Sequence, residues 1–155
     1  MIDTLDARLI ELLAAEPRVG VFEASRRLGV ARGTVQARLD RMQERGVIIG
    51  WGPDIEPAAI GHPVTAFITL EVTQAGGRKL IAERLSMIDE ILEAHTITGS
   101  GDMLCRAVAR DNADLQRVID AIVEVPGVVR TSTVIALATA VRYRTTPLVR
   151  ASASS

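Results

Sequence analysis

The chain has 155 residues, of which 48% are apolar and 24% are charged, and its formal net charge is −1. That apolar share is enough for a packed core, so the composition excludes a globally disordered protein. Residues 18–45 contain seven arginines and three acids, a net charge of +4, whereas residues 1–17 carry a net charge of −3. A basic segment in a nearly neutral protein indicates either a surface that faces a polyanion or a solvated helix face.

The cysteine and histidine counts argue against metal and disulfide chemistry. A single cysteine, Cys105, excludes a disulfide framework, and two histidines, His62 and His95, cannot supply a three-histidine zinc site. We therefore expect no metal and no cofactor. The first residues are acidic, unlike a signal peptide, and the apolar run 131–141 is shorter than the ~20 residues that span a bilayer. We expect a cytoplasmic protein without membrane association.

Three helices are predicted in the first 51 residues. Leucines at helical spacing between Leu5 and Leu13 indicate a helix over 3–15, with Asp3 as its N-cap and Pro17 just beyond its end. Shorter helices are expected over 22–28, closed by Gly29, and over 32–45, which stops at Gly46. Residues 47–51 form a β-rich run, and the glycines and prolines of 52–61 predict a hinge.

The rest of the chain follows the order strand, helix, strand, strand, helix, strand. Alternating apolar residues predict strands over 64–72, 90–98, 102–110 and 128–142. Helices are expected after the Gly76-Gly77 turn and after Asp111, whose capping partner would be Asp114. This order predicts a ferredoxin-like βαββαβ sandwich, so the fold class is α+β. The small and polar residues of 145–155 are expected to fray.

The basic segment has the organisation of a helix-turn-helix. Its second helix would enter the major groove, with Val35, Leu39 and Met42 inward and the small Gly33 and Ala37 outward. The run 47–51 would be a wing. The candidate DNA contacts on this helix are Arg32, Thr34, Gln36, Arg38 and Arg41, and those for phosphate positioning are Arg26, Arg27 and Arg45. A plain three-helix packing domain is the alternative.

Several motifs together resemble a known family. They are Leu5-Asp6-x-x-Leu9-Ile10-x-x-Leu13, Gly29-Val30-x-x-x-x-Val35-x-x-Arg38-Leu39-x-x-Met42-x-x-x-Gly46-Val47-Ile48, Gly61-His62-Pro63, Thr98-Gly99-Ser100-Gly101-Asp102, Pro126-Gly127-Val128 and Thr131-Ser132-Thr133. In order and spacing, over residues 2–148, the chain resembles the leucine-responsive regulatory protein/AsnC (Lrp/AsnC) family of bacterial transcriptional regulators. Two departures are Ala31, where many members have a capping serine, and Ala24-Ser25, where the usual pair is Leu-Ala.

The resemblance implies a domain organisation and partners. It implies a winged helix-turn-helix DNA-binding domain over 1–51, a hinge over 52–61, a ferredoxin-like effector and oligomerisation domain of RAM type over 62–144, and a tail over 145–155. The protein is then expected to regulate transcription by binding specific sequences of double-stranded DNA. It is also expected to form a homodimer, through the apolar faces of the C-terminal sheet, that assembles further, as members often do, into an octamer.

The turn before the third strand is the candidate effector site. Backbone N–H groups of Gly99, Ser100 and Gly101 could bind a ligand carboxylate, and Asp102 could accept from an α-ammonium group. The resemblance implies an amino acid or related small molecule here, with Met103 and, more weakly, Thr131 and Thr133 also contributing. A simple hairpin turn, with Asp102 bonded to its own backbone, is the alternative.

Three other functions share features with this sequence. An RNA-recognition motif has the same element order but needs aromatic residues on its central strands, and residues 103–109 contain none. Siroheme decarboxylases use the same family scaffold, and His62 and His95 are the only imidazoles that could serve such an enzyme. An effector-sensing module that no longer reads DNA is the third alternative. We expect a regulator and not an enzyme.

Overall fold

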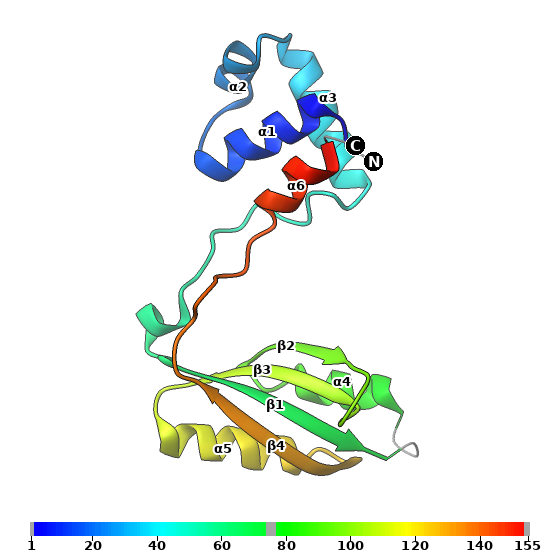
Figure 1. Ribbon diagram of the computed structural model, residues 1–155, viewed down its shortest axis with the longest axis vertical. Helices are drawn as coiled ribbons and strands as arrows, with labels where there is room; N and C mark the ends of the chain where they lie inside the picture. Colours follow the sequence, from blue (N-terminus) through cyan, green and yellow to red (C-terminus); the bar gives the residue numbers. More distant parts are fainter. Residues whose placement is uncertain (1, 74–76, 154–155) are drawn as a thin grey trace. The chain divides into compact units, whose positions relative to one another are not determined.

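The computed structural model describes residues 2–73 and 77–153 (Figure 1). The chain forms two compact units. One contains the chain up to Pro53 together with the segment from Val141 onward, and the other runs from Asp54 to Ala140. The first unit is therefore built from both ends of the chain, and each unit is described by itself below.

Three helices form the core of the first unit, as the sequence predicts. They are α1 (Thr4–Ala15), α2 (Val21–Leu28) and α3 (Arg32–Glu44). Asp3 caps α1 and forms a capping box with Asp6, because each side chain accepts a hydrogen bond from the other residue's backbone N–H. Gly29 ends α2 in the left-handed region, with φ of 70°. The cluster of buried apolar side chains between them consists of Leu9, Ala24, Val35, Leu39 and Met42.

The predicted strand over 47–51 is wrong. The backbone N–H groups of Val47 and Ile48 both donate to the carbonyl of Met42, so this stretch closes the end of α3. Ile48 packs against the helical core, whereas the neighbouring Ile49 is almost fully exposed. Of the apolar residues in 47–51, only Ile48 extends the core of the helical unit, and the stretch forms no wing strand.

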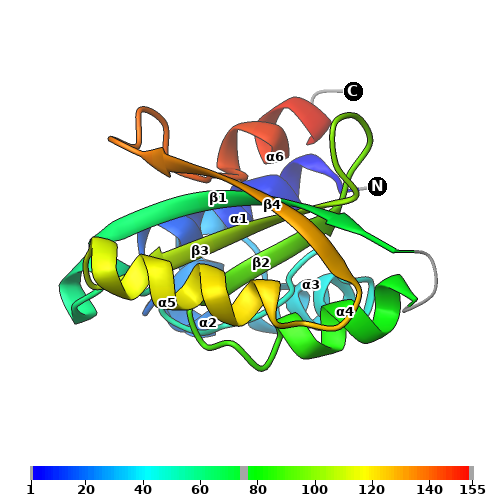
Figure 2. The ribbon, with the colours of Figure 1, turned by 90° about the horizontal axis from the view of Figure 1, so that it is seen from below.

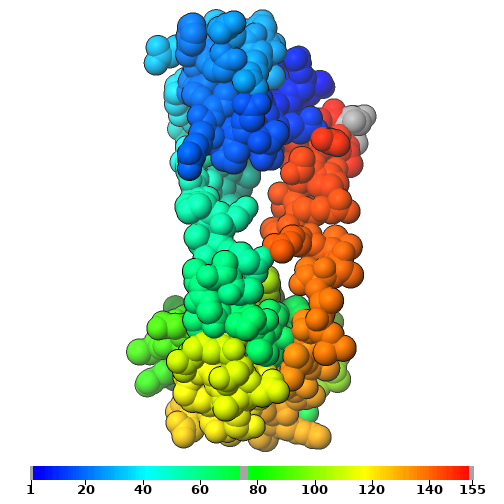
Figure 3. Space-filling view, turned by 90° about the vertical axis from the view of Figure 1, so that its left-hand side faces the viewer, coloured from blue at the N-terminus to red at the C-terminus, as the bar shows by residue number. Residues whose placement is uncertain are grey.

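The prediction that residues 145–155 fray is wrong for residues 146–153, and residues 154–155 lie outside the described part of the chain. Residues Thr146–Ala153 form helix α6, which lies beside α1 (Figures 1 and 2). Figure 3 shows α6, in red, against the blue surface of the N-terminal helices. The Arg150 guanidinium donates to the Glu11 carboxylate at 2.5 Å. The C-terminal segment thus belongs to the helical unit.

The second unit has the predicted βαββαβ order. Its elements are β1 (Val64–Val72), α4 (Arg78–Leu85), β2 (Ile91–Thr96), β3 (Met103–Ala109), α5 (Asn112–Val123) and β4 (Val128–Ala136), preceded by the short 3-10 helix η1 (Pro57–Ile60). The strands form an antiparallel sheet in the order β2-β3-β1-β4. Both helices cover one face of this sheet (Figure 2), and Ile81 of α4 and Val118 of α5 belong to the same buried core as Ile68 of β1.

Some boundaries differ from the prediction. The last strand ends at Ala136 and not at residue 142, because Ala136 pairs with Thr65, next to the first residue of β1. The second and third strands along the chain, β2 and β3, are shorter than predicted at both ends. Asp111 caps α5 as expected, but Asp114 accepts from the backbone N–H of Arg110, one residue before the cap. Of the predicted Gly76-Gly77 turn, Gly76 lies outside the described residues.

Candidate nucleic-acid interface and effector loop

The turn between α2 and α3 holds these helices in a helix-turn-helix arrangement. The N–H of Val30 donates to the carbonyl of Ser25 at 3.1 Å, which closes the C-terminus of α2. The buried Ser25 hydroxyl donates to the carbonyl of Phe22 at 2.7 Å, so this polar side chain is satisfied inside the core. A small residue at this position lets the two helices pack closely.

The N-terminal half of α3 presents an exposed polar face. Arg32, Thr34 and Gln36 are exposed, as are the small Gly33 and Ala37. Arg32 makes no side-chain hydrogen bond or ion pair with any residue that the structure describes. The Gln36 amide donates to Asp40 one turn away, at 2.8 Å. Long donors beside small residues suit close approach to a DNA groove.

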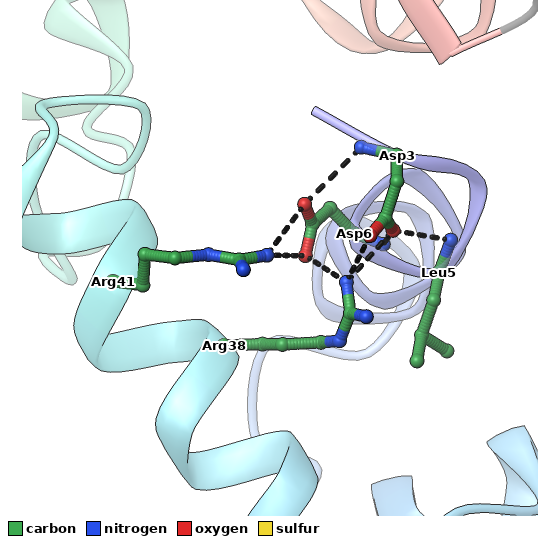
Figure 4. Close-up of polar contacts among 5 residues, drawn as sticks. All are labelled: Asp3, Leu5, Asp6, Arg38 and Arg41. Carbon is green, nitrogen blue, oxygen red and sulfur yellow. Dashed lines mark hydrogen bonds and ion pairs between the residues drawn. The ribbon is translucent and has the colours of Figure 1, made fainter. Parts of the chain in front are cut away.

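Two other predicted DNA contacts, Arg38 and Arg41, lie four and seven residues after Thr34 and therefore on the same flank of α3. Nη1 of Arg38 donates to Oδ2 of Asp3 at 2.6 Å and to Oδ1 of Asp6 at 2.7 Å (Figure 4). Nη2 of Arg41 donates to the two oxygens of Asp6 at 3.1 and 3.2 Å. The hydrogen bond from Arg38 lowers the pKa of Asp3 to about 2. Both arginines therefore already pair with acids at the start of α1.

The arginines predicted to position phosphates are partly neutralised within the helical unit. Arg26 pairs with Glu23 at 3.0 Å, and Arg27 pairs with both Glu23 and Glu16. The hydrogen bond from Arg27 lowers the pKa of Glu23. Arg45 is exposed at the C-cap of α3. All three side chains are accessible. A phosphate would compete with Glu23 for Arg26, and with Glu16 and Glu23 for Arg27.

In the second unit, Asp102 ties the candidate effector loop to the end of β1. Its carboxylate accepts from the backbone N–H of Val72 at 2.8 Å and lies 3.5 Å from the Arg78 guanidinium at the start of α4. Its own N–H donates to the carbonyl of Leu70 at 2.8 Å. The Asp102 side chain therefore bonds across the sheet end and not to its own backbone as the hairpin alternative supposed, while its carbonyl accepts from the N–H of Ile97 at 3.0 Å and closes the hairpin.

The two glycines of this loop are required for different structural reasons. Gly99 has φ of 109°, which favours glycine. A Cβ at Gly101 would lie 2.3 Å from Cγ2 of Thr69 and 3.2 Å from the carbonyl oxygen of Leu70, so a side chain here would force the loop or β1 to shift. Gly99 and Ser100 remain exposed. The loop therefore presents two exposed residues, Gly99 and Ser100, next to Gly101 and Asp102, which are held against the end of β1.

The remaining predicted effector residues lie on the two strands that flank β1. Met103 and Thr131 flank Leu70 on its two neighbouring strands, and Thr133 lies opposite Ile68. Met103 is buried in the core, whereas both threonines are partly accessible. Sequence reasoning missed Arg78 and Val72, because only the folded register brings the end of β1 and the start of α4 to the loop.

The two histidines lie on different elements and have different partners. His95, on the edge strand β2, contacts Glu93 at 2.9 Å, and this hydrogen bond is the main cause of a lowered pKa for Glu93. His62 precedes β1, and its backbone N–H donates to Pro57. Among residues 2–73 and 77–153, no group of three or more His, Cys, Asp and Glu side chains is placed to hold a metal ion. No helix in this described part is long and apolar enough to cross a membrane.

A helix-turn-helix with an exposed second helix, joined to a ferredoxin-like unit, defines a DNA-binding protein of the helix-turn-helix class. Residues 2–49 match the winged helix-turn-helix DNA-binding family, and residues 65–146 match the Lrp/AsnC ligand binding domain. The chain belongs to the Lrp/AsnC family and is a transcriptional regulator of that type.

Similar proteins agree with this assignment. The HTH-type transcriptional regulator FL11 of Pyrococcus abyssi is 32% identical over 89% of this chain and 91% of its own length. The structure of E. coli AsnC has a TM-score of 0.86 at 28% identity, covering 95% of this chain and 99% of that one. The feast or famine regulatory protein of M. tuberculosis, in complex with L-methionine, has a TM-score of 0.83 at 27% identity, with 93% and 97% covered. These matches give no support to the decarboxylase alternative.

Proposed function

We propose that this regulator binds specific sequences of duplex DNA through the N-terminal half of α3, as a homodimer that responds to an amino acid. The observation that carries this proposal is the exposed face of Arg32, Thr34 and Gln36, whose floor consists of Gly33 and Ala37. Arginine reads guanine and glutamine reads adenine through paired hydrogen bonds in the major groove. Arg26, Arg27 and Arg45 would position phosphates from the flanks.

The dimer would use the sheet face that the helices leave uncovered. Phe67 and Val134 are opposite each other in register on this face, and both are exposed. Exposed apolar side chains next to each other on a sheet indicate a protein contact. Two recognition helices related by a twofold axis would read half-sites about one helical turn, or a multiple, apart. Further assembly, up to an octamer, and action in the cytoplasm belong to the same proposal.

The effector would bind at the loop before β3. Support comes from the exposed Gly99 and Ser100 above the fixed Asp102, and from the M. tuberculosis relative, which is in complex with L-methionine. Backbone N–H groups of the loop would bind the ligand carboxylate, and free lone pairs of Asp102 would accept from its ammonium group. Gly101, Met103, Thr131 and Thr133 would form the surroundings.

DNA binding is tested by selecting sequences from random duplexes with the full chain and titrating the enriched duplex by fluorescence anisotropy. We expect an enriched sequence that is preferred over its scrambled version and whose affinity falls steeply with salt. Arg32→Ala is expected to weaken binding, whereas Arg84→Ala, an exposed arginine on α4, is the matched control. Recovery of no preferred sequence at low salt would refute the proposal.

The effector and the dimer need separate measurements. Calorimetric titration with L-methionine and the other common amino acids is expected to show binding that Asp102→Asn removes and the exposed-acid control Asp89→Asn leaves intact. Light scattering at micromolar concentration is expected to show a dimer or larger assembly that Val134→Arg disrupts and Leu137→Arg, beyond β4, does not. A monomeric wild-type chain would contradict the dimer.

A further inference from the structure

One cluster of charged side chains joins the first helix of the chain to the recognition helix. It consists of Asp3 and Asp6 with Arg38 and Arg41, and we call it the α1–α3 clasp (Figure 4). Asp3 is the N-cap of α1, and Asp6 lies three residues later in its first turn. Arg38 and Arg41 are likewise three residues apart on α3. Residues at this spacing lie on the same side of a helix, so two rows of opposite charge meet along the contact.

Asp6 is the centre of the clasp. Its side chain is only 3% exposed, and its two oxygens accept from Arg38, from Arg41 and from the backbone N–H of Asp3. A carboxylate removed from water needs such compensation, and losing one partner is costly because the charge stays buried. The Arg38 side chain is itself only 22% exposed. These two guanidiniums therefore already serve a buried charge.

The clasp also accounts for the charge asymmetry of the sequence. Residues 1–17 carry a net charge of −3 and residues 18–45 a net charge of +4. Part of the positive charge faces the acids of α1 and is neutralised within the unit. The exposed Arg32, by contrast, has no such partner among the described residues.

We propose that Arg38 and Arg41 are positioning residues, which hold α3 against Asp3 and Asp6, and that they do not contact DNA. The clasp then fixes the rotation and position of α3 relative to α1, and so determines which of its side chains reach the groove. Base reading falls to the N-terminal half of α3. This inference rests on the proposed DNA binding of α3.

Removing an acid near the DNA separates the two roles of the arginines by the sign of the effect. If Arg38 and Arg41 contacted phosphates, Asp6→Asn would release them and remove a repulsive charge, so affinity would rise. If they position α3, the same variant loosens the helix, and affinity for the selected duplex falls. Glu44→Gln is the matched control, because Glu44 is an exposed acid on α3 with no side-chain partner in the described part of the chain.

The experiment titrates the selected duplex at several salt concentrations with the full-length wild type, Asp6→Asn, Arg38→Gln, their double variant, Glu44→Gln and Arg32→Gln. For Asp6→Asn and for Arg38→Gln we expect a loss of about fivefold or more, the size of one specific contact, with an unchanged salt slope. The double variant is expected to lose little more than the stronger single one, because both break one network. Arg32→Gln is the reference for a direct contact, with a shallower slope if it reaches a phosphate.

The opposite pattern would overturn the inference. In that pattern, Asp6→Asn binds the selected duplex as tightly as Glu44→Gln does, or more tightly. The salt slope for Arg38→Gln is then also shallower, by about one phosphate contact. Amide hydrogen exchange of α1 and α3 is measured on the same proteins. Both single variants are expected to speed exchange, non-additively in the double variant, and unchanged exchange would also overturn the clasp. If the wild type selects no DNA sequence, the proposed function fails, and the exchange data alone then decide whether the clasp holds α3.

Discussion

Each of the two units contains a nearly buried aspartate that pairs with two arginines. The two clusters differ in how far apart in the sequence the paired residues are. Asp6 binds arginines 32 and 35 residues further along the chain, so it ties one helix to another. Asp114 binds Arg110 and Arg117, its neighbours four and three residues away, at the start of α5. Both carboxylates are satisfied, but only Asp6 bonds directly to the side chains of a distant element, whereas Asp114 reaches the distant Glu90 only through Arg117. Sequence separation therefore distinguishes a tertiary tie from a local cap.

Breaking the long-range cluster is expected to have the largest effect. Arg38→Met keeps the apolar stem of the side chain but leaves Asp6 with Arg41 as its one remaining ion-pair partner, beside the backbone N–H of Asp3. We expect the helical unit to lose about 2–3 kcal/mol, toward the low end for a buried pair that loses one partner because the second arginine remains. Denaturant unfolding followed by the fluorescence of Trp51, which belongs to this unit, measures the loss. An unfolding curve like that of the wild type would show that the cluster contributes no net stability.

Breaking the local cap is expected to cost less and to stay local. Asp111 accepts from the backbone N–H of Asp114 and so caps α5. Asp111→Ala is expected to destabilise the second unit by about 1 kcal/mol, as for other N-caps. Hydrogen exchange should quicken in α5 and remain unchanged in α1 and α3. A comparable change in α3 would mean that the two clusters do not differ in the way their sequence separations suggest.

Acid titration tests the exposed half of the long-range cluster. The hydrogen bond from Arg38 lowers the pKa of Asp3 to about 2 from its ordinary 3.8. A carboxylate with a lowered pKa stabilises the fold above its ordinary pKa, and this contribution is lost as the pH falls through the lowered value. The helical unit should therefore weaken between about pH 4 and pH 2, and less so in Asp3→Asn. The difference is expected to be small, because the Asp3 side chain is half exposed. Trp51 fluorescence at stepped pH values measures it, and parallel curves would refute it.

The features that the sequence predicts correctly depend on neighbouring residues. Asp3 as the cap of α1, Gly29 as the end of α2 and the alternation of β1 are all local patterns, and the structure confirms them. The order of elements in the second unit follows from the same patterns, and with it the ferredoxin-like topology. Local signals are sufficient where the backbone itself requires a residue type.

The features that the sequence misses depend on partners far along the chain. On α3, helical periodicity places Arg38 outside the apolar stripe, which is correct, but it does not reveal that α1 lies there with two acids. The apolar run 47–51 looks like a strand, whereas its Ile48 completes a helical core. Residues 145–155 look too small and polar for structure, and α6 forms where α1 provides a surface for it. In the second unit, the link from Asp102 to Val72 depends on the strand register.

The ion pair between α1 and α6 separates burial from sequence distance. Arg150 and Glu11 are 139 residues apart, further than any pair in the α1–α3 clasp, but the Arg150 side chain is 70% exposed. Exposed pairs contribute little, so Glu11→Gln is expected to cost the helical unit less than about 1 kcal/mol. Its effect should also shrink at high salt, which screens surface charges more than buried ones. The same Trp51 unfolding assay, at low and high salt, measures both. A loss as large as that of Arg38→Met would mean that distance along the chain, and not burial, decides which charges hold this unit together.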